Sequence, residues 1–113
     1  MSEDPVDLSN FKSIIEGDTE LGKEMFGMFV LSSEDLLRKL QRGIGEENSN
    51  NAWYEASHAL KGISRGLGAG HLADLCEDAQ EAFAQDNDIK IDFLAKIKAE
   101  HSSVVVFLDA QDL

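Results

Sequence analysis

The residues best suited to chemistry in this sequence lie between His58 and Gly62, in the run His-Ala-Leu-Lys-Gly. At about 100° per residue, the apolar side chains around this run share one arc of a helix. They are Trp53, Ala56, Leu60, Ile63 and Leu67. His58 falls almost opposite that arc, and its imidazole is a good nitrogen nucleophile near neutral pH, where it is largely unprotonated. The pattern therefore predicts a nucleophile that a stiff helix displays to solvent, within reach of another macromolecule.

Three neighbours on the same predicted helix bear on that nucleophile. Lys61, three positions after His58, brings an ammonium beside the imidazole, where it could stabilise developing negative charge. A glycine in a helix interior costs about 1 kcal/mol relative to alanine, so we interpret Gly62 as a position that keeps the ring accessible. Arg65, two turns after His58, either adds to the positive field, pairs with acidic groups on a partner, or is an ordinary solvated arginine.

The remaining titratable or polar candidates are more distant in sequence. Gln80 lies one step off the apolar arc of the next predicted helix, so its amide either holds one ring nitrogen of His58 or is simply solvated. The spacing of His58, His71, Cys76 and His101 fits no standard metal-ligand pattern, and we expect no metal site. We expect His101 at the boundary of the core and Cys76 as a small buried packing residue.

Composition limits the class of protein. The 113 residues suit one domain spanning 1–113, with residues 1–6 as a flexible tail. A formal charge of −12, from 10 basic and 22 acidic side chains, repels phosphate backbones and anionic headgroups, which argues against nucleic acid or membrane partners. No apolar run approaches the ~18 residues of a membrane span. A single cysteine allows no internal disulfide, which suits the reducing cytoplasm, where we expect the protein to act. We also expect it to be a monomer.

Helical periodicity accounts for the chain after Pro5, and no segment alternates like a strand. We expect helices over 7–16, over 19–42, from the polar run 45–51 to 67–69, over 71–85 and over 89–109. Asp18 should cap the second helix and Gly43 should end it. Ile14 and Phe83 should face inward. These elements predict an all-α fold, an antiparallel up-and-down four-helix bundle with a short additional N-terminal helix.

Around His58 the chain resembles the histidine-containing phosphotransfer (HPt) domains of multistep two-component relays. A spaced set of residues carries the resemblance: His58, Leu60, Lys61, Gly62, Ser64, Leu67, Gly68 and Ala69, followed by Leu72, Leu75, Cys76 and Glu77. The runs over 6–11 and 25–29 also look like the first two helices of such domains. The resemblance covers about residues 6 to 108, nearly the whole chain.

The resemblance implies a phosphocarrier rather than an enzyme, without kinase activity or a nucleotide site. It implies that His58 accepts a phosphoryl group from the phosphoaspartate of one receiver domain and passes it to the aspartate of another. Lys61 would contact the phosphoryl oxygens, and Gln80 matches a glutamine found in some family members. No cofactor is expected on this chain, because the Mg²⁺ belongs to the receiver. The expected partners are receiver domains of response regulators or of hybrid sensor histidine kinases.

Two further expectations concern binding. The alternative function is a helical binding module that docks a receiver or a kinase without ever being phosphorylated. For docking, a small apolar patch beside an exposed reactive group suits a transient interface. The candidates for that patch are Leu8, Phe11, Ile15, Phe26 and Val30.

Overall fold

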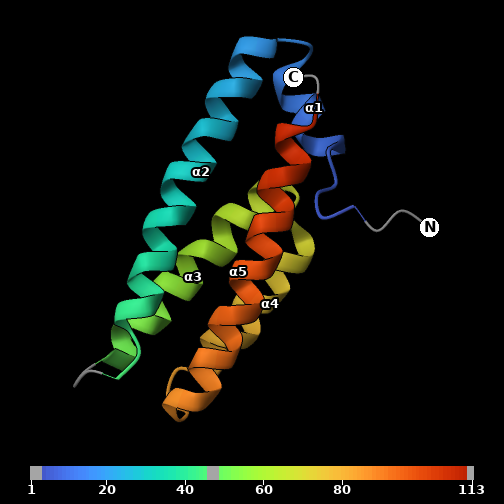
Figure 1. Cartoon of the computed structure of the whole chain (residues 1–113). Coiled ribbons are helices and arrows are strands. Elements are labelled where there is room, and N and C mark those ends of the chain that lie inside the picture. The colour runs from blue at the N-terminus through green and yellow to red at the C-terminus, as the bar shows by residue number, and fades with distance from the viewer. Residues whose placement is uncertain (1–3, 46–48, 112–113) are drawn as a thin grey trace.

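The computed structural model describes residues 4–45 and 49–111, and within them it contains five helices and no strand. They are α1 (Ser9–Ile15), α2 (Thr19–Arg42), α3 (Ser49–Leu67), α4 (Gly70–Glu81) and α5 (Asn87–Asp109). The short helix α1 lies at the end of the bundle where α2 begins and α5 ends (Figure 1). The all-α helical bundle with a short N-terminal helix is confirmed. No described helix is long and apolar enough to cross a membrane.

Local chemistry sets the ends of α2. The Asp18 carboxylate accepts a hydrogen bond from the backbone N–H of Leu21 at 3.0 Å, which satisfies one of the free donors in the first turn. At the other end, the N–H of Gly43 bonds back to the carbonyl oxygens of Lys39 and Leu40, at 3.0 and 2.9 Å. Both bounds are as the sequence predicted.

The core is formed by side chains that every long helix contributes. The short α1 adds Phe11, and the largest fully buried apolar side chains are Trp53, Phe11, Leu40, Leu60, Leu72, Ile97 and Leu108. Trp53 is 0% exposed, and its indole N–H donates to the carbonyl oxygen of Ala79 at 2.7 Å. This bond crosses from α3 to α4, so the same residue that fills the core also aligns the two helices that carry the candidate site.

Three expectations about packing were wrong. Helix α4 ends at Glu81 rather than at residue 85, because the chain turns there and the N–H of Gln85 bonds to the carbonyl of Ala82 at 3.0 Å. Phe83 therefore leaves the helical face and is 40% exposed. Ile14 is 50% exposed, since only Phe11 and Ile15 of the short α1 reach the core.

The segment before α1 is fastened to the turn between α3 and α4. The N–H of Asp7 donates to the carbonyl oxygen of Gly68 at 2.8 Å, and Val6 is only 2% exposed. Val6 therefore belongs to the core and not to the tail expected over 1–6, of which residues 1–3 lie outside the described residues. Gly68 has φ +98°, and a Cβ there would collide with the carbonyl oxygen of Asp7. The close approach therefore requires glycine.

Two titratable side chains are buried away from the His58 face. His101 lies between α5 and α2, where its Nε2 is 2.7 Å from the Ser33 hydroxyl and its ring stacks on Phe29. Its burial agrees with the expected boundary position, and this burial lowers the pKa of its imidazole. Lys90 donates to the Asn50 side chain at 2.7 Å, and burial lowers the pKa of its ammonium.

Candidate functional site

The site lies on the hairpin formed by α3 and α4. Only Gly68 and Ala69 separate the two helices, so they run antiparallel and their facing residues pair across the hairpin. His58 is exposed on α3, and its Nδ1 lies 3.3 Å from Oε1 of Gln80 on α4. Trp53, bonded to Ala79 at 2.7 Å, holds the neighbouring part of α4 against α3. The core thus sets the register that brings Gln80 to His58.

The contact with Gln80 distinguishes the two ring nitrogens of His58. An amide oxygen only accepts hydrogen bonds, so with Oε1 of Gln80 toward the ring the contact at 3.3 Å favours the tautomer that carries the proton on Nδ1. The lone pair is then on Nε2, the nitrogen that the amide does not engage. A neutral imidazole with this tautomer is ready to attack an electrophile through Nε2.

Tyr54 lies beside His58, and Phe83 packs against Tyr54; neither was predicted to contribute to the site. The Tyr54 ring lies almost parallel to the imidazole, with centroids 6.3 Å apart and 4° between the planes. Phe83 meets Tyr54 edge-on, with centroids 5.4 Å apart. The signal for Tyr54 was present, because residues four apart are neighbours on a helix surface. The position of Phe83 depended on where α4 ends and had no local signal.

Lys61 and Gly62 occupy the turn of α3 that follows His58. Gly62 is exposed, and a Cβ built there meets no atom within 4 Å. No contact within the protein therefore requires glycine at this position, and the space beside the imidazole stays open. Within the described residues Lys61 forms no ion pair, so its charge is available to an anion at the site.

Arg65 is engaged by α4 rather than by open solvent. Its guanidinium lies 3.4 Å from a carboxylate oxygen of Asp74 and 3.8 Å from one of Glu77. All three side chains are about half exposed or more, so the pairing is weak and easily rearranged. The two carboxylates offset the positive field that Arg65 would otherwise add near His58.

Comparisons with known proteins agree with this arrangement. The model of the Hpt domain family matches residues 24–105, which is most of the chain. The chain belongs to the Hpt domain family. The Hpt domain model begins within α2, so α1 lies outside the matched region. No curated protein matched the sequence significantly.

A solved structure shares the fold of this Hpt domain. It is the crystal structure of histidine-containing phosphotransfer protein B from Pseudomonas aeruginosa PAO1, with a TM-score of 0.79 and 24% sequence identity. The match covers 96% of this chain and 94% of that chain. Membership of the Hpt family assigns the chain a phosphotransfer role in two-component phosphorelays, in which Hpt proteins interact with receiver domains.

Burial excludes two of the five residues expected to form the docking patch of the Hpt domain. Phe11 and Ile15 are 1% and 7% exposed, because they anchor α1 in the core, and they are unavailable to a partner. Phe26 lines a hollow with Leu108 and Asp109 at the end of α5. Leu8 and Val30 are half-buried against the core.

An apolar groove lies instead between α2 and α3. Its volume is about 310 Å³, and it is lined by Met25, Met28, Phe29, Ser32, Ile63, Gly66 and Leu67. Met28 is 68% exposed at its edge. His58, Gly62 and Gly66 follow one another at four-residue intervals along α3, so a row without large side chains leads from the imidazole into the groove.

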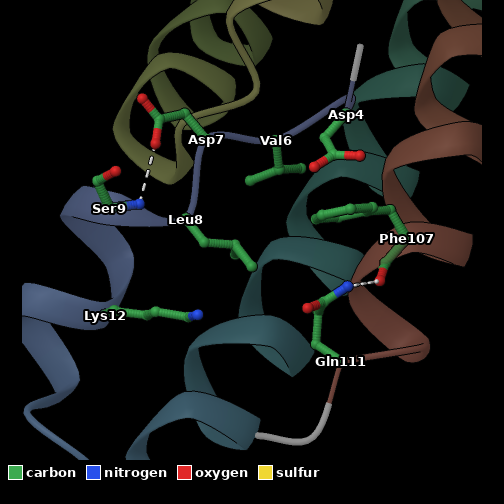
Figure 2. A pocket seen from close by; sticks show the side chains of 8 residues that line it. All are labelled: Asp4, Val6, Asp7, Leu8, Ser9, Lys12, Phe107 and Gln111. Atoms are coloured by element: carbon green, nitrogen blue, oxygen red, sulfur yellow. Dashed lines mark hydrogen bonds between the residues drawn. The ribbon is translucent and has the colours of Figure 1, made fainter. Parts of the chain in front are cut away.

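A larger hollow, of about 670 Å³, lies between the segment before α1 and the end of α5. Figure 2 shows Leu8 and Lys12 on one side of it and Phe107 and Gln111 on the other. None of the residues around His58 lines this hollow.

Residues 4–45 and 49–111 contain no group of three or more histidine, cysteine or acidic side chains that could hold a metal ion. Cys76 is fully buried, and this burial raises the pKa of its thiol to about 12. At neutral pH it is therefore a thiol and a poor nucleophile or ligand.

Proposed function

We propose that His58 is the phospho-acceptor of a phosphorelay intermediate, which takes a phosphoryl group from one receiver domain and passes it to another. The observation that carries the proposal is the environment of the imidazole. His58 is exposed, its Nδ1 is held by Gln80 at 3.3 Å, and its Nε2 is left free. A chain that had only a docking role would have no use for a ring held in a nucleophilic tautomer.

The transfer follows from this geometry. The Nε2 lone pair forms a bond to phosphorus while the bond from phosphorus to the aspartyl oxygen of the receiver breaks, which regenerates the aspartate carboxylate. The Gln80 oxygen stabilises the ring as it gains positive charge, since it accepts the Nδ1 proton in a hydrogen bond. Lys61 stabilises the negative charge of the phosphoryl oxygens, which is the main task in phosphoryl transfer.

The chain supplies the nucleophile, and the receiver supplies the Mg²⁺ and the aspartate. The partners in this proposal are receiver domains of response regulators or of hybrid sensor kinases, and the chain acts as a monomer in the cytoplasm. It binds no cofactor of its own. Its acidic surface, with a formal charge of −12, supports a protein partner over a nucleic acid or a membrane.

The test is incubation with a phosphorylated receiver and Mg²⁺. We expect label on the chain that is labile in acid, stable in alkali and absent from His58→Gln. His71→Gln is the matched control, because His71 is an exposed histidine of α4 that lacks this environment, and it should be labelled normally. A chain that binds the receiver but never becomes labelled would support the alternative, a docking module without phosphorylation.

We also propose that the groove between α2 and α3 is the docking surface for the receiver. It is apolar, and on α3 it is lined by Ile63, Gly66 and Leu67, which follow His58 and Gly62 along the helix. Met28→Glu should raise the receiver concentration needed for half-maximal transfer. Leu31→Glu is the control, since Leu31 is 72% exposed on the same helix and does not line the groove. Equal effects of the two substitutions would refute this surface.

A further inference from the structure

Tyr54 lies against His58, yet nothing in the proposed reaction uses it. It precedes His58 by one helical turn, and the two rings are nearly parallel, 4° apart in plane and 6.3 Å between centroids. Tyr54 is 41% exposed, so burial alone does not account for its position. With Gln80 on the α4 side at 3.3 Å, the imidazole is confined on two sides.

Tyr54 is itself restrained. Phe83 meets its ring edge-on at 5.4 Å between centroids, with 78° between the planes, which is a favourable arrangement for two aromatic rings. Phe83 lies in the turn that follows the end of α4 at Glu81, where its backbone N–H bonds to the carbonyl oxygen of Gln80 at 3.2 Å. Two ring contacts therefore connect the turn after α4 to the imidazole, the first from Phe83 to Tyr54 and the second from Tyr54 to His58.

We propose that Tyr54 is a positioning residue for His58. Braced by Phe83, its ring holds the imidazole in the rotamer that directs Nδ1 to Gln80 and turns Nε2 to the incoming phosphorus. A side-chain torsion has about three staggered rotamers. If the His58 side chain lost its restraint and occupied all three equally, about a third of the molecules would keep the productive rotamer. We therefore expect loss of the Tyr54 ring to slow transfer about threefold.

The inference rests on the proposed function, because it concerns the same imidazole. A small phosphodonor separates positioning from docking, since it presents no protein surface to Tyr54. With phosphoramidate in its N-protonated form, ⁺H₃N–PO₃²⁻, the Nε2 lone pair forms the new bond to phosphorus, the bond between phosphorus and the donor nitrogen breaks, and ammonia leaves with the three protons that it already carries. The Nδ1 proton stays on the ring in its bond to Gln80.

The experiment compares the parent chain, Tyr54→Leu and Tyr54→Phe in phosphorylation by phosphoramidate and in transfer from a phosphorylated receiver, at saturating and at low receiver concentration. Tyr54→Leu should be about threefold slower with both donors, and Tyr54→Phe should restore the parent rates because it keeps the ring. The nitrogen chemical shifts of His58 give a second readout, independent of phosphorylation. Tyr54→Leu should lower the share of the tautomer with the proton on Nδ1.

Each other outcome is decisive. Parent rates in Tyr54→Leu with phosphoramidate, with a loss only at low receiver concentration, would make Tyr54 a docking residue and overturn the positioning role. Unchanged rates and an unchanged tautomer would do the same. Failure of the parent chain to be phosphorylated by either donor would instead refute the proposed function itself, and the positioning role with it.

Discussion

Replacing Gly62 should make the protein more stable and a poorer phosphocarrier at once. A helix-interior glycine costs about 0.8–1.0 kcal/mol relative to alanine. No atom lies within 4 Å of a Cβ built at Gly62, so no steric penalty offsets that gain. Gly62→Ala should therefore raise the free energy of unfolding by about 1 kcal/mol, which corresponds to an increase in Tm of about 4 °C for a chain of this length.

Gly62→Gln keeps most of that stabilisation and adds a long side chain beside the imidazole. Residues four apart on a helix are neighbours, so the glutamine would fill the space through which a receiver approaches Nε2. We expect the transfer rate from a phosphorylated receiver to fall at least about tenfold, since a displacement of about 1 Å from the reactive geometry can cost a hundredfold. The assay is single-turnover transfer, with thermal unfolding followed by circular dichroism.

Gly27→Gln is the matched control. Gly27 lies in the interior of α2, no atom lies within 4 Å of its Cβ position, and it lines neither the site nor the groove beside it. It should be stabilised as much as Gly62→Gln and transfer phosphoryl groups at the parent rate. Equal transfer rates for Gly62→Gln and the parent would refute the access role, and a loss of stability in Gly62→Ala would refute the helix argument.

Three further predictions test the packing of the helices that carry the site. Gly68→Ala should lower the free energy of unfolding by about 2 kcal/mol or more, because φ is +98° and a Cβ would meet Asp7, whereas the unhindered Gly70→Ala should cost nothing in the same denaturant titration. Burial lowers the pKa of the His101 imidazole below its value in the unfolded chain. The contribution of neutral His101 to the free energy of unfolding is therefore complete above about pH 6.5 and is lost as the pH falls toward the folded pKa. In denaturant titrations, the free energy of unfolding of His101→Gln should fall less than that of the parent between about pH 6.5 and about pH 5. Cys76, with its pKa raised to about 12, should react with iodoacetamide at pH 8 only as fast as the chain unfolds, and a folded chain that is alkylated as fast as a denatured one would contradict its burial.

Much of the fold was predictable because it depends on local chemistry. The bounds of α2 follow from the Asp18 cap and the Gly43 stop, and both appear in the structure. The exposure of His58 follows from helical periodicity, since the apolar arc of α3 lies opposite the imidazole. The end of α4 was predicted at residue 85, four residues after its observed end at Glu81, because no proline or glycine in the following turn marks the end of the helix.

The docking residues show where periodicity stops being informative. A helical wheel separates the apolar from the polar side of α2, but it does not say which part of the apolar side meets α3 and which meets α5. Phe26 was expected beside His58 and lies against the end of α5, while Met25 and Met28 line the groove with α3. Phe11 was a candidate for the docking patch and fills the core.

By itself, the amino-acid sequence determined that the chain is helical and that His58, Lys61 and Gly62 share one face of α3. Those properties depend on residues within a few positions of one another. Only the tertiary structure decided that Gln80 reaches Nδ1, that Asp74 and Glu77 engage Arg65, and that Phe83 braces Tyr54. Each of these contacts joins α3 to α4 or to the turn after it, and its partners are set by the register and rotation that packing around Trp53 imposes on the hairpin.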